Sequence, residues 1–91
     1  METRYTKSPS SVGLSIDVRG KTVDEAMLDI DRYLEEAAYV GYKEVTIIHG
    51  KGTGALRQGI QQELKQHRKI KSFRNGKYGE GEMGVTVVEI K

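Results

Sequence analysis

Ten consecutive residues determine the architecture of this chain: Val45-Thr46-Ile47-Ile48-His49-Gly50-Lys51-Gly52-Thr53-Gly54. The first four are apolar or β-branched on both faces, as in a strand at the centre of a sheet. The next six form a glycine loop, and three apolar residues then follow at helical spacing, Leu56, Ile60 and Leu64. A central strand that leads through a tight loop into a helix is typical of an α/β fold.

The residues before this unit have the same order of elements. Apolar and polar residues alternate over residues 14–19, which predicts a half-buried strand that ends at Gly20. Thr22 and Glu25 have the spacing of a capping box, in which each side chain bonds to the other residue's amide. Apolar residues at helical spacing follow, so we expect an amphipathic helix from this box to about Gly41.

Two more strands follow the second helix, which we expect to end near His67. Residues 70–75 and 85–90 have strand composition, and the glycine-rich loop between them, residues 76–84, is expected to be mobile. The order βαβαββ, with right-handed crossovers, makes the first three strands parallel and the last one antiparallel to them. We predict an α/β two-layer sandwich: a four-stranded mixed sheet, the two most apolar strands in its middle, with two helices on one face.

The chain has the length of one domain, and its N-terminal residues differ from the rest. They are polar, carry the only proline, Pro9, and show no periodicity, so we predict a disordered linker or tail over residues 1–12 and a folded domain over residues 13–91. The sequence has 0 cysteines, which excludes disulfides and cysteine-held zinc. It has no apolar run long enough to span a membrane and no signal peptide, so we expect a cytoplasmic protein that does not bind membranes.

Charge is divided unevenly along the chain. Residues 21–44 hold three basic and seven acidic residues, whereas residues 49–78 hold eight basic residues and one acidic residue. The basic segment suits a phosphate backbone, although the same charges also fit a solvated helix and hairpin. We take these cations as candidate phosphate contacts: Lys51, Arg57, Lys69, Lys71, Arg74 and Lys77.

Residues able to carry chemistry lie at the ends of the first two strands. Asp17 and Arg19 are two apart on the first strand and so share a face, and His49 and Lys51 follow the second. Because parallel strands present ligands at their carboxyl ends, we expect these four side chains to converge on one edge. Glycines let a backbone approach a ligand, and the helix after the loop offers unpaired amides, so the loop supplies further candidate phosphate contacts: Gly50, Lys51, Gly52, Thr53 and Gly54.

Each of these residues also has a purely structural interpretation. The loop lacks both the Walker pattern and the dinucleotide fingerprint, and a plain tight turn accounts for its glycines. His49 fits a hydrogen-bonded histidine of the core, and Asp17 with Arg19 fits a surface ion pair. Among the tyrosines, Tyr78 near the tip of the last hairpin is the better candidate for stacking on a base.

Taken together, the motifs resemble those of the Smr domain family. Ile16-Asp17-Val18-Arg19-Gly20 is similar to the family's first motif, Leu-Asp-Leu-His-Gly in many members, and His49-Gly50-Lys51-Gly52 is similar to its second, His-Gly-x-Gly. The resemblance covers residues 14–90, and Arg19 with the run 50–57 resembles the form at the C-terminus of type-two MutS homologues. It implies the strand order 1-2-4-3 and a fold similar to the C-terminal domain of translation initiation factor three.

The resemblance implies nicking endonuclease activity on DNA, branched recombination intermediates included, within a longer MutS-like ATPase that suppresses homologous recombination. In some members it implies cleavage of RNA at stalled or collided ribosomes, with rRNA as the ligand. The implied catalytic residues are Asp17, Arg19 and His49: Asp17 would orient or deprotonate a water, and His49 would protonate the leaving oxygen. Many members have histidine at the position of Arg19. Arginine does not deprotonate, so Arg19 can only clamp a phosphate or stabilise negative charge.

Three functions from different classes fit this sequence. The first is a nicking endonuclease, in which any magnesium would be held mainly by water and substrate, because one carboxylate is too few for a protein-held site. The second is a binding module without catalysis, on branched DNA or ribosomal RNA. The third is an interaction domain that uses the acidic helix, residues 22–40, to bind a protein. Arg19 favours the second and Asp17 beside His49 favours the first; as an isolated domain we expect a monomer without a resident cofactor.

Overall fold

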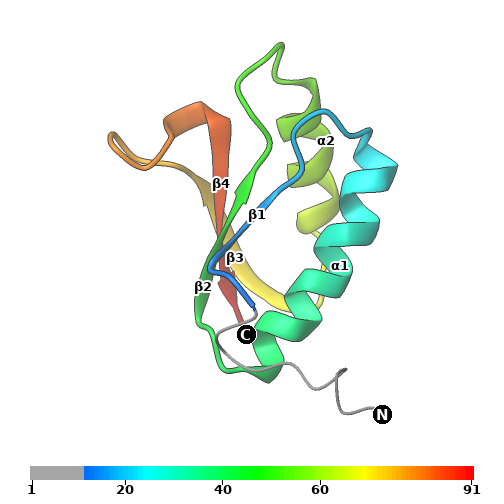
Figure 1. Ribbon diagram of the computed structural model, residues 1–91, viewed down its shortest axis with the longest axis vertical. Helices are drawn as coiled ribbons and strands as arrows, with labels where there is room; N and C mark the ends of the chain where they lie inside the picture. Colours follow the sequence, from blue (N-terminus) through cyan, green and yellow to red (C-terminus); the bar gives the residue numbers. More distant parts are fainter. Residues whose placement is uncertain (1–11) are drawn as a thin grey trace.

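The computed structural model describes residues 12–91 (Figure 1). All of the predicted tail except Val12 lies outside the described residues. Val12 itself is 4% exposed and belongs to the hydrophobic core. The hydroxyl groups of Tyr33 and Tyr42 donate to the carbonyl oxygens of Gly13 and Val12 and fix this first segment to the domain.

A four-stranded sheet forms one layer of the molecule. Its strands are β1 (Ser15–Asp17), β2 (Glu44–Ile48), β3 (Ile70–Asn75) and β4 (Val85–Ile90), in the order β1-β2-β4-β3. β1 is parallel to β2, and β4 is antiparallel to both of its neighbours, β2 and β3. The predicted mixed sheet, its strand order and the two apolar strands at its centre are therefore confirmed.

Two helices, α1 (Val23–Tyr39) and α2 (Ala55–Leu64), form the second layer and cover one face of the sheet, as predicted (Figure 1). The capping box at the start of α1 is present. Oγ1 of Thr22 accepts from the N–H of Glu25 at 3.1 Å, and Oε1 of Glu25 accepts from the N–H of Thr22 at 3.0 Å. No helix within residues 12–91 is long and apolar enough to cross a membrane.

The core lies between the helices and the sheet and includes alternate residues of β2 and β4. The two helices pack tightly where Gly59 of α2 meets Val23 at the start of α1. A Cβ added at Gly59 would lie 2.4 Å from Cγ2 of Val23, a distance that leaves no room for a side chain. This contact holds the N-terminal halves of α1 and α2 together at the end of the domain where β1 and β2 finish (Figure 1).

Candidate functional site

The predicted site residues lie at the end of the sheet where β1 and β2 finish. Asp17, Ile48 and Val85 form the last row of paired residues across β1, β2 and β4. Paired residues share a face of the sheet, and the neighbours of Asp17 in sequence contact the core, so Asp17 lies on the face opposite the helices. Beyond this row come three connecting segments: residues 18–22, the glycine loop (residues 49–54) and the hairpin arm (residues 76–84).

Asp17 and Arg19 form a two-pronged ion pair. Nε of Arg19 lies 3.0 Å from Oδ1 of Asp17, Nη2 lies 2.6 Å from Oδ2, and the amide N–H of Arg19 donates to Oδ1 at 3.0 Å. Hydrogen bonding from the Arg19 side chain lowers the pKa of Asp17 to about 2, so this exposed carboxylate stays ionised. The pair fixes one edge of the guanidinium and directs the other edge, with Nη1, away from the carboxylate.

His49 is only 5% exposed, and both of its ring nitrogens are engaged within the protein. Nδ1 lies 3.1 Å from the carbonyl oxygen of Gly50, which can only accept, so Nδ1 carries the proton. Nε2 then accepts from the hydroxyl of Thr86 at 2.8 Å, and this hydroxyl oxygen accepts from the side-chain amide of Gln61 at 2.9 Å. Burial lowers the pKa of His49 below its usual value, in agreement with a neutral ring.

The expected convergence of four side chains on one edge is only partly present. Asp17 and Arg19 meet, but the ring of His49 points to the helix side of the sheet, where Thr86 lies. The reason is strand alternation: His49 follows Ile48, which is paired with Asp17, so His49 and Asp17 point to opposite faces. His49 therefore has the surroundings of a structural histidine, and its role as a proton donor stays a prediction that no free ring nitrogen supports.

The glycine loop is fixed at both of its ends. The N–H groups of His49 and Gly50 donate to the carbonyl oxygen of Gly84 at 3.1 and 2.9 Å, which ties the loop to the hairpin arm. Gly50 has a φ of +84°, and a Cβ there would lie 3.3 Å from Cγ of Arg19, so glycine lets the loop and the arginine pack together. At the other end, the N–H of Gly54 donates to the carbonyl oxygen of Lys51 at 3.0 Å. Gly54 is the N-cap of α2 and has no side chain to cap it, and the first amide of the helix, that of Ala55, donates to Oγ1 of Thr53 at 3.3 Å.

A pocket of about 430 Å³ lies between the glycine loop and the start of α1, lined by residues 20–23 and 49–56. The first turn of α2 has no acidic residue, whereas the first turn of α1 contains Asp24 and Glu25. The positive end of α2, with a glycine as its N-cap, therefore makes this side of the pocket favourable for an anion. The loop residues predicted to contact phosphate all line this pocket: Gly50, Lys51, Gly52, Thr53 and Gly54.

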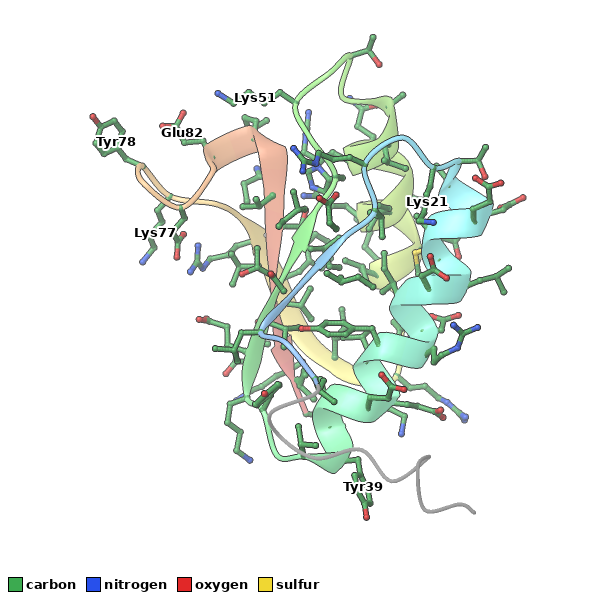
Figure 2. All side chains as sticks on the ribbon, in the orientation of Figure 1. Lys21, Tyr39, Lys51, Lys77, Tyr78 and Glu82 are labelled. Atoms are coloured by element: carbon green, nitrogen blue, oxygen red, sulfur yellow. The ribbon has the colours of Figure 1, made fainter. Side chains whose placement is uncertain are left out.

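Three of the predicted basic contacts lie around this pocket and the arm. Lys51 is exposed on the glycine loop, and its side chain packs along Gly84, where a Cβ would lie 3.4 Å from Cγ of Lys51. The guanidinium of Arg57 lies over Gly54, where a Cβ would be 3.1 Å from Nη2. Figure 2 shows Lys77 on the hairpin arm and Lys51 near the base of the arm. The structure thus brings these cations to the same end of the sheet as Arg19.

The other three basic residues are not brought to this end as free cations. Nη1 of Arg74 lies 2.8 Å from Oε1 of Glu80 and Nη2 lies 3.2 Å from Oε2, so the charge of Arg74 is compensated within the protein. Lys69 and Lys71 flank the first residue of β3, which is paired with Ile90 at the far end of β4. A strand of 6 residues is roughly 17 Å long, and this length separates the two lysines from the row of Asp17.

Sequence reasoning missed Thr86, Gln61 and Glu80, which fix the surroundings of the site. Thr86 had a signal, because it is a hydroxyl residue among the three valines Val85, Val87 and Val88 of a central strand. Gln61 and Glu80 had none, since their partners are set by the register of distant elements. Within residues 12–91, no three side chains of the metal-binding types come together as a metal site.

Comparison with known proteins identifies relatives over most of the chain. The model of the Smr domain family matches residues 16–91. The protein named endonuclease MutS2 from Caldicellulosiruptor saccharolyticus is 64% identical over 81 residues, which are 89% of this chain and 10% of that protein. The endonuclease MutS2 of Geobacillus kaustophilus is 56% identical over 80 residues, 88% of this chain and 10% of that protein. The chain therefore spans about a tenth of the length of these relatives.

Solved structures are also similar to this one, and two of them illustrate the match. The crystal structure of the Smr domain of Thermus thermophilus MutS2 has a TM-score of 0.82 and 47% identity, and covers 85% of this chain and 96% of that one. YdaL, a stand-alone small MutS-related protein from Escherichia coli, has a TM-score of 0.77, covers 97% of this chain and 70% of that one, and at 21% identity shows the fold alone. The match of the family model over residues 16–91, with the MutS2 relatives, shows that the chain belongs to the Smr domain family.

Proposed function

We propose that this domain binds nucleic acid at the loop end of its sheet and nicks DNA there, branched recombination intermediates included. The loop end is our name for Arg19, residues 49–57 and the hairpin arm. Relatives named endonuclease MutS2 support this class of activity, which would be exercised within a longer MutS-like chain. The observation that carries the proposal is the Asp17–Arg19 ion pair packed against Gly50 of the glycine loop.

Hydrolysis of a phosphodiester requires stabilisation of charge and two proton transfers. A water attacks phosphorus and loses a proton, while the bond from phosphorus to the leaving oxygen breaks and that oxygen gains a proton. Negative charge develops on the phosphoryl oxygens, and we assign Arg19 to bind them. We assign Asp17 to positioning the guanidinium, because a carboxylate with a pKa of about 2 is a weak base.

A second function is a binding module without catalysis. It is favoured by the state of the two residues that would move protons. Both ring nitrogens of His49 bond within the protein, and both carboxylate oxygens of Asp17 bond Arg19. With these groups engaged, the domain would hold branched DNA, or the RNA of a stalled or collided ribosome, and leave cleavage to other parts of a longer chain.

Nicking of supercoiled plasmid, with and without magnesium, separates the two functions. Arg19→Lys keeps the charge and loses the two-pronged geometry, so we expect plasmid binding to be retained and nicking to slow by roughly 100-fold, the usual loss on removing one oxyanion donor. Arg32→Lys, exposed on α1, is the matched control and should nick at the wild-type rate. Binding without nicking by the wild-type domain supports the second function, and wild-type nicking by Arg19→Lys contradicts the role assigned to Arg19.

A further inference from the structure

The hairpin arm carries a side chain that neither proposed function uses. Tyr78 is 95% exposed, the largest value for any large hydrophobic residue in the part of the chain that the structure describes. Single exposed aromatic residues are common on protein surfaces and by themselves indicate no function. Tyr78 differs from these in the backbone that holds it and in the charges around it.

The hairpin arm is closed by hydrogen bonds. The carboxylate of Glu80 accepts from the guanidinium of Arg74 at 2.8 and 3.2 Å and from the N–H of Lys77 at 2.7 Å. The N–H of Gly76 donates to the carbonyl oxygen of Glu82 at 3.1 Å, and a Cβ on Gly76 would lie 2.9 Å from that oxygen. The glycine content of the arm led us to expect a mobile loop. In the structure the arm is a turn closed by these hydrogen bonds, with Tyr78 at its tip (Figure 2).

The arm also lies next to residues that we assign to phosphate binding. It begins at the row of paired residues that contains Asp17. Lys51 packs against Gly84 at the base of the arm. Figure 2 shows Lys77 and Tyr78 on the projecting part of the arm, at the same end of the molecule as Lys51. A nucleic-acid strand held by the glycine loop therefore has the arm beside it.

We propose that Tyr78 stacks on an unpaired base of the bound nucleic acid, so that the preferred substrate carries a nucleotide outside the duplex at the loop end. A base within a duplex is covered on both faces by its neighbours, whereas an unpaired base offers a face to an aromatic ring. A ring on a closed turn loses little conformational freedom on binding, which favours affinity. The inference rests on the proposed function and adds the structural class of its substrate: branched, flapped or single-stranded.

The charges near Tyr78 favour nucleic acid over a protein as the partner of the ring. Lys77 and Lys51 present two positive charges at the surface, and the negative charge of Glu80 is paired with Arg74. Glu82 is also exposed on the arm near Tyr78 (Figure 2), so these side chains together leave a net positive charge of one around the ring. Each base of a nucleic acid is followed by a phosphate, so one ligand engages the ring and the cations together.

Binding of two DNA probes by the 91-residue chain tests this inference. One probe is an intact duplex, and the other is the same duplex with one unpaired fluorescent adenine analogue whose emission is quenched by stacking. We expect the wild-type domain to bind the second probe about ten-fold more tightly and to quench it, a factor within the range that one stacked base contributes. Tyr78→Ala should lose the preference and the quenching and keep its affinity for the intact duplex.

Two further variants control for the loss of an aromatic ring as such. Tyr78→Phe keeps the stacking face and should keep the preference. Tyr39→Ala removes a tyrosine that is 78% exposed at the opposite end of the domain (Figure 2) and should behave as wild type. Equal wild-type affinity for the two probes, or a preference that survives Tyr78→Ala, overturns the inference while duplex binding still upholds the proposed function. Absence of binding to either probe overturns both.

Discussion

Thr86 shows how one hydroxyl sets the state of a neighbouring ring. It is fully buried in β4, donates to Nε2 of His49 and accepts from Gln61. A buried polar group left without a partner costs about 1–3 kcal/mol, so the three side chains hold one another in place. The N–H groups of His49 and Gly50 also donate to the carbonyl oxygen of Gly84. These backbone bonds and the bond of the ring to Thr86 together fix the start of the glycine loop.

Replacing Thr86 with valine preserves the shape of the side chain and removes this hydroxyl. Nε2 of His49 and the amide of Gln61 then lose a buried partner, and we expect the free energy of unfolding to fall by about 2 kcal/mol. Urea unfolding measures the loss, and nitrogen NMR of the imidazole reports whether the proton stays on Nδ1. The matched control is Thr46→Val, half-buried on β2. An equal loss in both variants contradicts the role given to Thr86.

The buried ring also predicts how stability depends on pH. Burial lowers the pKa of His49 below 6.5, so as pH falls the unfolded chain takes up this proton before the folded chain does. Its contribution to the free energy of unfolding is therefore complete above about pH 6.5 and is lost as pH falls below that value. Urea unfolding at several pH values should show a steeper decline for the wild type than for His49→Gln. Identical declines would mean that His49 is not held neutral by burial.

The Asp17–Arg19 pair could be predicted from the sequence, but the surroundings of His49 could not. Residues two apart on a strand share a face whatever the rest of the fold does, so the pair follows from local spacing. The partner of His49 is Thr86, 37 positions away in the chain. The register of β2 against β4 decides whether they meet, and local patterns do not contain that register.

Among the elements, α1 and α2 determine the shape of the pocket beside the glycine loop. They pack tightly at Gly59 against Val23, and Val23 itself lines the pocket. A β-branched residue in a helix has one strongly preferred rotamer, so Val23 does not turn aside to admit a larger neighbour. The spacing of the two helices therefore depends on glycine at position 59.

Gly59→Ala has two effects of opposite sign on the free energy of unfolding. Alanine favours a helix over glycine by about 1 kcal/mol, whereas overpacking a fitted contact costs about 1–3 kcal/mol. With a Cβ only 2.4 Å from Cγ2 of Val23, we expect the cost to prevail and the free energy of unfolding to fall by about 1 kcal/mol. Thermal or urea unfolding decides the sign, with Gln62→Ala on the exposed face of α2 as a neutral control. A stabilised Gly59→Ala domain would show that α1 and α2 are not packed this closely.

The elements were predicted correctly where their boundaries have local signals. The capping box of Thr22 marks the start of α1 and is present in the structure. The predicted end of α2 near His67 was wrong, because the helix ends at Leu64. After Leu64 the chain forms turns, with His67 bonded to Leu64 and Ile70 to His67, that lead into β3. These turns connect α2 to β3. Helical periodicity describes the residues of a helix and not the turns that follow it, so it did not locate this end of α2.

Across the whole domain, the basic residues are divided between the two ends of the sheet. Lys69, Lys71, Arg74 and Lys77 are close in sequence, and we took them with Lys51 and Arg57 as candidate phosphate contacts. β3 runs the length of the sheet, however, and separates Lys69 from Lys77. Lys71 also lies 3.9 Å from Glu89, and Arg74 is paired with Glu80. Among residues 12–91, the loop end therefore keeps three cations outside ion pairs, Lys51, Arg57 and Lys77, beside Arg19, whose charge is compensated by Asp17.

This distribution predicts the salt dependence of binding. Three phosphate contacts, from the cations outside ion pairs, give a slope of about −2.7 in a plot of log affinity against log salt concentration. Lys51→Ala should reduce the magnitude of the slope by about 1, because one fewer counterion is released. Lys69→Ala removes the same charge at the other end of the sheet and should leave the slope unchanged. A larger effect from Lys69→Ala than from Lys51→Ala would mean that nucleic acid binds at the end of the sheet opposite the loop end.

The claim that nucleic acid binds at the loop end is tested most directly by an NMR titration of the isotope-labelled domain with duplex DNA. Backbone amide shifts report which residues change their surroundings on binding. We predict shifts in residues 19–23, in residues 49–57 and in the hairpin arm, with the amides of residues 65–71 unchanged. Shifts confined to residues 65–71, with no shift in the amides of the glycine loop, would contradict binding at the loop end.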